Sequence, residues 1–137
     1  MIFEVLAAGG RMPKWVTALE RATFGKPWHQ VGPKEWAILA PPSGYATWSV
    51  TPEIQEAELL RVAVVPLKRG TGLGRALLRE SEARLRAQGI TTFLLEVRVS
   101  NASARSLYAS EDWREEGLRR GYYPDGEDAV LYRKKLG

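Results

Sequence analysis

The chain of 137 residues contains no cysteine, a single histidine and no long hydrophobic run. The lack of cysteine excludes disulfides, thiolate metal ligands and a cysteine nucleophile, and the lone His29 argues against a histidine-rich metal centre, so we expect no bound metal. No apolar stretch approaches the roughly 18 residues that cross a bilayer, and the first residues lack the order of segments of a signal peptide. We therefore expect a cytoplasmic protein that does not act at a membrane.

What is present fits one globular domain. Hydrophobic residues make up 45% of the chain and charged residues 26%, and the length suits a single core, so we expect one domain over residues 1–137. The formal net charge is +4. Such a charge suits an anionic ligand or a ribonucleoprotein partner, but it is equally the ordinary solvated surface of a basic protein.

The first half of the chain predicts a short strand, a helix and a hairpin. Residues 2–6 form the strand, and Pro13 stands where a helix would begin. Gly25 would end this helix, and one of its faces would carry four residues at helical spacing: Trp15, Ala18, Leu19 and Ala22. A turn rich in proline and glycine joins two further strands, residues 35–40 and 45–50.

The middle of the chain predicts a strand, helix, strand unit. Residues 58–65 continue the hairpin series, and residues 72–88 form an amphipathic helix that Gly89 ends. The apolar face of this helix holds Gly74, Leu77, Leu78, Ser81 and Leu85. Residues 91–97 form the next strand, and such a crossover predicts a parallel, right-handed pair.

The last third predicts a capped helix and a closing pair of strands. Asn101 can cap a helix on which Ala104, Leu107 and Tyr108 share a face. The two strands follow near Trp113 and over residues 129–133. The expected fold class is therefore α+β, a mixed sheet flanked by helices.

A glycine-rich turn joins a strand directly to a helix in the stretch Val64–Ala76, VVPLKRGTGLGRA. The glycines let the backbone come close to a ligand, and the free amide N–H groups of a helix start attract phosphate. Lys68, Arg69 and Arg75 add positive charge there. The spacing is neither G-x-x-x-x-G-K-[ST] nor G-x-G-x-x-G, and a helix entry without any ligand explains the turn as well.

The stretch ELLRVAVVPLKRGTGLGRALL, residues 58–78, resembles the acetyl-CoA motif of the GNAT superfamily of N-acetyltransferases. In that motif a strand is followed by R/Q-x-x-G-x-G/A and by a helix whose amides bind the pyrophosphate of CoA. The resemblance implies a mostly antiparallel mixed sheet with a central, splayed parallel strand pair. It also implies that acetyl-CoA contacts Val62, Ala63, Val64, Lys68, Arg69, Gly70, Thr71, Gly72, Leu73, Gly74 and Arg75.

Two later blocks, LEVRVSNASARSLYASEDW at 95–113 and RRGYYPDGEDAVLY at 119–132, resemble the bacterial ribosomal-protein-alanine N-acetyltransferases. The pair Pro27 and Trp28 resembles the PWS element of the same family. This resemblance implies acetylation of a protein N-terminus, with a ribosomal protein beginning in alanine as the acceptor partner. In the family a glycine usually follows the helix that Asn101 would cap here. This chain has Asp112 at that position, so Asp112 must adopt a left-handed turn.

The same blocks imply roles for individual residues. Glu96 would take the proton of the attacking amine, directly or through water, and Tyr108 would protonate the leaving thiolate. Near CoA the resemblance implies Asn101 and Arg105; for the acceptor it implies Trp28, Tyr122 and Tyr123, with Glu127 and Asp128 as weaker candidates. Each has a structural alternative: Glu96 paired with Arg98 or another arginine at a sheet edge, Tyr108 as a packed aromatic, Arg105 as a solvated cation, and the two loop tyrosines as edge packing.

Three other functions compete with N-terminal acetylation. A related enzyme with the same cofactor would acetylate a lysine, a polyamine or a small metabolite, and a binding-only relative would hold acetyl-CoA without turnover. A nucleic-acid-binding module would use basic residues as a phosphate-binding surface: Arg61, Lys68, Arg69, Arg75, Arg119 and Arg120. Direct nucleic-acid binding is disfavoured because it leaves Glu96 and Tyr108 unexplained.

Overall fold

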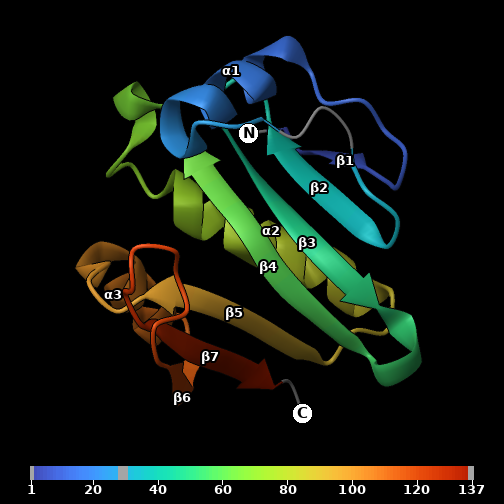
Figure 1. Cartoon of the computed structure of the whole chain (residues 1–137). Helices are drawn as coiled ribbons and strands as arrows, with labels where there is room; N and C mark the ends of the chain where they lie inside the picture. Colours follow the sequence, from blue (N-terminus) through green and yellow to red (C-terminus); the bar gives the residue numbers. More distant parts are fainter. Residues whose placement is uncertain (1, 28–30, 136–137) are drawn as a thin grey trace.

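The computed structural model describes residues 2–27 and 31–135, which form one mixed sheet with helices on both faces (Figure 1). The strands are β1 Glu4–Leu6, β2 Glu35–Ala40, β3 Gly44–Thr51, β4 Glu56–Val64, β5 Thr92–Arg98, β6 Arg114–Arg119 and β7 Ala129–Lys135. The helices are α1 Lys14–Phe24, α2 Leu73–Ala87 and α3 Ala102–Ser110, with short 3-10 turns at Pro52–Ile54 and Pro66–Lys68.

The sheet has seven strands in the order β1-β2-β3-β4-β5-β7-β6. Every neighbouring pair is antiparallel except β4 and β5, which run parallel on either side of the α2 crossover. This arrangement confirms the predicted α+β fold and the predicted element order.

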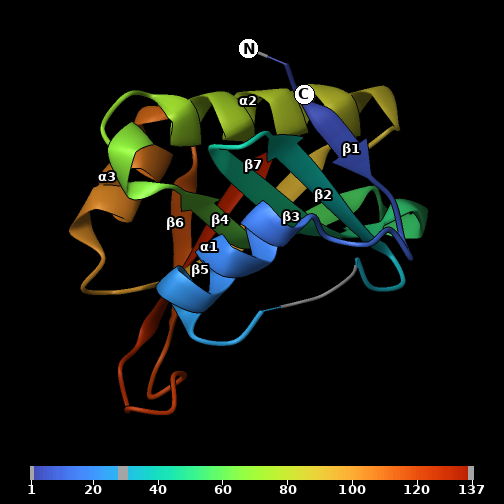
Figure 2. The ribbon, with the colours of Figure 1, turned by 90° about the horizontal axis from the view of Figure 1, so that it is seen from above.

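Helices α2 and α3 lie on one face of the sheet and α1 lies on the other (Figure 2). On the first face, Leu78 and Leu85 of α2 pack with Phe93 and Leu95 of β5 in the main hydrophobic core. The predicted apolar face of α2 is confirmed, since Leu77, Leu78, Ser81 and Leu85 are all fully buried.

The predicted inner face of α1 is partly wrong. Leu19 is buried, but Ala18 and Ala22 are exposed, and the helix instead buries Val16 and Glu20. The reason is a buried polar contact: the Tyr45 hydroxyl donates a hydrogen bond to Glu20 at 2.8 Å, and Arg61 pairs with the same carboxylate at 3.1 Å. These two partners rotate a charged residue inward where an apolar one was expected.

The C-terminal predictions are confirmed. The Asn101 side chain accepts a hydrogen bond from the amide of Ala104 at 3.2 Å and so caps α3. Asp112 adopts a left-handed conformation with φ of 67°. The turn at Asp112 places Trp113, 3% exposed, against Phe93 and Tyr108.

Candidate active site

Strands β4 and β5 separate halfway along their length. Their parallel pairing ends at Leu59 and Leu95, although β4 continues to Val64. A β-bulge precedes the separation, because Arg61 and Leu59 face consecutive residues of β3 and Leu60 between them has no partner there; bulges bend strands. Figure 1 shows β4 and β5 diverging beyond this point. The backbone edge beyond the β4–β5 pairing belongs to the predicted thioester-binding residues: Val62, Ala63 and Val64.

The glycine-rich turn forms a nest at the start of α2. Gly70 and Gly72 have φ of 76° and 88°, a left-handed conformation that other residues rarely adopt. Gly72 is the N-cap, and no side chain within the described residues caps the helix. The first amide N–H groups of α2 are therefore left for a ligand, and the helix dipole favours a negative one.

A groove of about 470 Å³ lies over this nest, between the start of α2 and α3. Eight predicted CoA-binding residues line it: Val64, Lys68, Arg69, Gly70, Gly72, Leu73, Gly74 and Arg75. The α3 side supplies Ser103, Ala104 and Leu107. Thr71 instead lines a neighbouring hollow with Lys68 and Leu73, and its hydroxyl donates to the Lys68 carbonyl at 2.5 Å.

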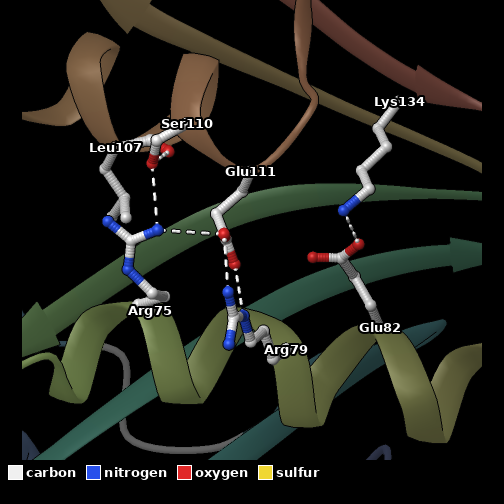
Figure 3. Close-up of polar contacts among 7 residues, drawn as sticks. All are labelled: Arg75, Arg79, Glu82, Leu107, Ser110, Glu111 and Lys134. Atoms are coloured by element: carbon white, nitrogen blue, oxygen red, sulfur yellow. Dashed lines mark hydrogen bonds and ion pairs between the residues drawn. The ribbon is translucent and has the colours of Figure 1, made fainter.

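Arg75 does not stand free in the groove (Figure 3). Its guanidinium donates to Ser110 at 3.0 Å and to the carboxylate of Glu111 at 2.9 Å. Arg79, one turn later, also pairs with Glu111, at 2.6 Å. These arginines, Arg79 first, hold the pKa of Glu111 below its ordinary value. Arg75 therefore ties α2 to α3, and less of its charge remains for a phosphate than the sequence suggested.

Arg105 lies on α3 but does not line the groove. Its guanidinium donates to the Tyr132 hydroxyl at 3.1 Å, the Val99 carbonyl at 2.9 Å and the Glu115 carboxylate at 2.6 Å. These bonds direct it toward β6 and β7, which leaves the guanidinium engaged away from the groove. Asn101 does not line the groove either, and its side-chain oxygen is used in capping α3.

Glu96 lies on β5 just beyond the end of the β4–β5 pairing. Its side chain is 18% exposed, with one carboxylate oxygen 3.7 Å from Nε of Arg119. The other oxygen, Oε2, is buried and has no hydrogen-bond partner among the described residues. The expected alternative partner, Arg98, binds Asp125 and Glu127 instead, whereas Arg119 is an arginine at the sheet edge.

A second carboxylate, not predicted as part of the site, shares a pocket with Glu96. Glu58 on β4 and Glu96 line a cavity of about 240 Å³ together with Arg119. Burial first, and then the negative charge of Glu96, raise the pKa of Glu58, while Arg119 opposes the shift. The sequence indicates only weakly that Glu58 belongs to the site. Glu58 lies between the buried residues Ala57 and Leu59, and this alternation is equally typical of any half-exposed strand.

Tyr108 lies on the other face of the sheet, 5% exposed, in contact with Trp113 and Tyr132. Burial raises the pKa of Tyr108 to about 12, with smaller contributions from Tyr123 and Tyr132. The phenol therefore keeps its proton throughout the neutral range.

Tyr122 and Tyr123 lie in the loop between β6 and β7, and their rings meet edge to face at 5.1 Å. The carboxylate of Glu96 raises the pKa of Tyr122, and burial, with a smaller contribution from Glu96, raises that of Tyr123. The structure thus brings both tyrosines to Glu96. The two weaker candidates are engaged in the loop itself: Glu127 with Arg98 and Ser100, and Asp128 with the amide of Gly121. Trp28 lies outside the described residues.

Within residues 2–27 and 31–135, no cluster of three or more metal-ligating side chains occurs. No helix in the same ranges is long and apolar enough to span a bilayer. Two members of the alternative basic surface, Arg61 and Arg75, are paired with Glu20 and Glu111. That surface therefore offers fewer free cations to a nucleic acid than its arginine count suggests.

The family model described as "Acetyltransferase (GNAT) family" matches residues 14–111. Over 81 residues the chain is 47% identical to the [Ribosomal protein bS18]-alanine N-acetyltransferase of Escherichia coli strain K12, covering 57% of this chain and 55% of that protein. It is 41% identical over 71 residues to the enzyme of that name from Haemophilus influenzae, covering 52% of this chain and 48% of the other. The chain spans about half the length of the curated relatives it matches.

The fold is also similar to a solved structure, that of the ribosomal-protein-S18-alanine N-acetyltransferase from Escherichia coli. The TM-score is 0.78 at 29% sequence identity, and the superposition covers 99% of this chain and 95% of that one. The structural likeness therefore covers nearly the whole chain, whereas the alignments with these two curated relatives cover 57% and 52% of it.

Proposed function

Because the chain belongs to the GNAT family of acetyltransferases, we propose that it transfers an acetyl group from acetyl-CoA to the N-terminal α-amine of a protein. The observation that carries this proposal is the site where β4 and β5 separate. A nest of backbone amides suited to phosphate opens on the α2 side of the separation, and Glu96, with one carboxylate oxygen unpartnered in the described part of the chain, lies on the opposite side.

The donor side would hold acetyl-CoA through backbone groups. The free amides at the start of α2 suit its diphosphate, and Lys68 and Arg69 supply charge at the groove. The edge of β4 that extends past β5 suits the pantetheine arm, whose amides can pair with a strand. The thioester would then lie near the gap between the strands, with Glu96 and Tyr108 on opposite faces of the sheet.

The reaction needs a base because the acceptor amine, with a pKa of about 8, is mostly protonated at neutral pH. Glu96 would accept that proton, directly or through a water molecule. The amine nitrogen then attacks the carbonyl carbon of the thioester, the carbon–nitrogen bond forms, and the carbon–sulfur bond breaks with its electron pair on sulfur. The nitrogen gives its second proton to solvent in this step, which leaves a neutral amide.

Tyr108 would stabilise the departing thiolate. A thiol has a pKa of about 8.5, so full proton transfer from a phenol of pKa about 12 costs roughly 5 kcal/mol. This cost favours a hydrogen bond from the phenol to the developing thiolate, with the final proton coming from solvent as CoA leaves. In this mechanism Tyr108 donates a hydrogen bond to the thiolate and keeps its proton.

The acceptor side points to a peptide. Tyr122 and Tyr123 project beside Glu96, where their hydroxyls can hold the backbone of an incoming N-terminus. The relatives whose names specify an acceptor are ribosomal-protein-alanine N-acetyltransferases. By that similarity we propose a ribosomal protein beginning with alanine as the natural acceptor.

A small polyamine is the second candidate acceptor. Glu58 supplies a second carboxylate in the pocket of Glu96. Two carboxylates suit a molecule with two ammonium groups better than a peptide with one. This reading keeps the same donor and the same catalytic residues.

The test is release of free CoA from acetyl-CoA, measured with peptides that differ only in their first residue. Turnover with the alanine-first peptide, abolished when its amine is blocked, supports N-terminal acetylation. Turnover with spermidine but with no peptide would replace it with the small-amine function. Glu96→Gln should abolish most turnover, whereas Glu53→Gln, on the exposed turn before β4, serves as the matched control. Acetyl-CoA binding without any turnover would contradict both candidates.

A further inference from the structure

Arg119 reaches the candidate active site from the sheet edge. It is the last residue of β6, an outer strand, and its side chain is 55% exposed. The Nε atom lies 3.7 Å from Glu96, too long for a good hydrogen bond but well within ionic reach. The guanidinium carbon also lies 5.5 Å from the centre of the Tyr122 ring. One arginine thus contacts both the proposed base and a proposed acceptor-binding residue.

The pocket beneath Arg119 contains two carboxylates that repel each other. Glu58 is the Cα partner of Leu94, and Glu96 follows two residues later on the same face of the strand. Both side chains line the same cavity, with Leu94 and Leu131 as apolar neighbours. In this setting burial and the negative charge of Glu96 both disfavour the ionised form of Glu58 and raise its pKa.

Other charged groups nearby are already neutralised. Arg133 and Glu116 line the same cavity and pair with each other. Arg98, on the strand of Glu96, pairs with Asp125 and Glu127. The remaining titratable groups near Glu96 are phenols. Tyr122 and Tyr123 have raised pKa values and are neutral near pH 7, and Tyr132, which lines the same cavity, donates its hydroxyl proton to Glu115. In the described part of the chain, Arg119 is therefore the cation left to balance Glu58 and Glu96.

We propose that Arg119 is a positioning residue that balances the facing carboxylates Glu58 and Glu96, so that Glu96 meets the acceptor amine as an anion. The inference rests on the proposed function for its catalytic consequence, but the charge balance itself does not. Because Arg119 is exposed and only loosely paired, it can move aside when the acceptor ammonium enters and supplies the positive charge in its place.

The first test needs no turnover. The side-chain carboxyl of Glu58 is followed by carbon-detected NMR as the pH is varied, in the unaltered protein, in Arg119→Gln and in Arg120→Gln. Arg120 is the matched control because it is the exposed neighbour of Arg119 and shows no ion pair in the described chain. We expect Arg119→Gln to raise the titration midpoint of Glu58 by about one pH unit, and Arg120→Gln to leave it unchanged.

The second test is the pH profile of kcat/KM with saturating acetyl-CoA and an alanine-first peptide. Arg119→Gln should move the acidic limb upward by about one pH unit, and Arg119→Lys should restore most of the original profile. An unchanged Glu58 midpoint in Arg119→Gln, or equal effects of the Arg119 and Arg120 changes, would overturn the inference. Inactivity of the unaltered protein would instead count against the proposed function, while the NMR titration would still decide the role of Arg119.

Discussion

Replacing Gly72 with alanine should destabilise the protein through its backbone alone. Gly72 has φ of +88°, and a Cβ built there meets nothing within 4 Å, so no steric clash adds to the cost. The left-handed conformation costs an ordinary residue about 1–2 kcal/mol. For 137 residues the entropy of unfolding is about 0.29 kcal/mol/K, so Tm should fall by about 3–7 °C.

Gly74→Ala is the matched control, two residues away in the same nest. Gly74 lies inside α2 without a positive φ, and its Cβ would meet only Leu107 at 3.9 Å, an ordinary contact. Alanine in a helix is favoured over glycine by about 0.5–1 kcal/mol, so Tm should rise by about 2–3 °C. The GNAT motif itself accepts glycine or alanine at this position.

The same pair tests where acetyl-CoA binds. Gly72→Ala disturbs the backbone that presents the first amides of α2, so the dissociation constant for acetyl-CoA should rise about tenfold, which corresponds to about 1.4 kcal/mol. Gly74→Ala should leave it within about twofold. Differential scanning calorimetry gives Tm, and isothermal titration calorimetry gives the affinity. Equal stability of the two variants would refute the argument from backbone conformation, and equal affinities would refute the location of the diphosphate.

Three further predictions concern single side chains. Glu96→Gln should lower kcat by about 10²- to 10⁴-fold while leaving acetyl-CoA affinity nearly intact, as measured by CoA release and by calorimetric titration; unchanged turnover would remove Glu96 from the mechanism. Tyr108→Phe should lower kcat by about 10- to 100-fold at unchanged affinity, because a hydrogen bond to a charged group contributes about 1.5–3 kcal/mol. Glu111 has a lowered pKa when folded, so its stabilisation is fully present above its ordinary pKa of about 4.5 and is lost as the pH falls below that value. The difference in Tm between the unaltered protein and Glu111→Gln should therefore close in acid, and a difference that does not change between pH 7 and pH 3 would contradict this.

The sequence was sufficient for the elements whose pattern is local. The α2 helix has a clear apolar face, a glycine at each end and a strand on either side, so its position and its parallel crossover could be predicted. The nest at Gly70 and Gly72 could be predicted for the same reason, since left-handed backbone conformations favour glycine over short distances along the chain.

Contacts between distant residues could not be predicted in this way. Glu20 faces inward because Tyr45 and Arg61, 25 and 41 residues away, bind its carboxylate. Arg105 turns away from the groove because Tyr132, 27 residues later, accepts its hydrogen bond. The presence of Glu58 and Glu96 in one cavity likewise depends on the register of β4 and β5, which places Glu58 opposite Leu94. None of these partners leaves a periodic signal in the sequence.

Groups of opposite charge lie on the two sides of the separated strands, and they would attract the two substrates to different sides. On the α2 side, the groove presents backbone amides with Lys68 and Arg69, which attract an anion such as the diphosphate of acetyl-CoA. On the opposite side, Glu58 and Glu96 line the cavity that would receive the proposed acceptor, which would arrive as a cation. Although the net charge of the chain is +4, the candidate site therefore has one positive side and one negative side. Both sets of charged groups are partly exposed to solvent. Added salt should therefore weaken acetyl-CoA binding and also raise the KM for a cationic acceptor. A neutral donor analogue without the diphosphate should lose only the first of these two effects.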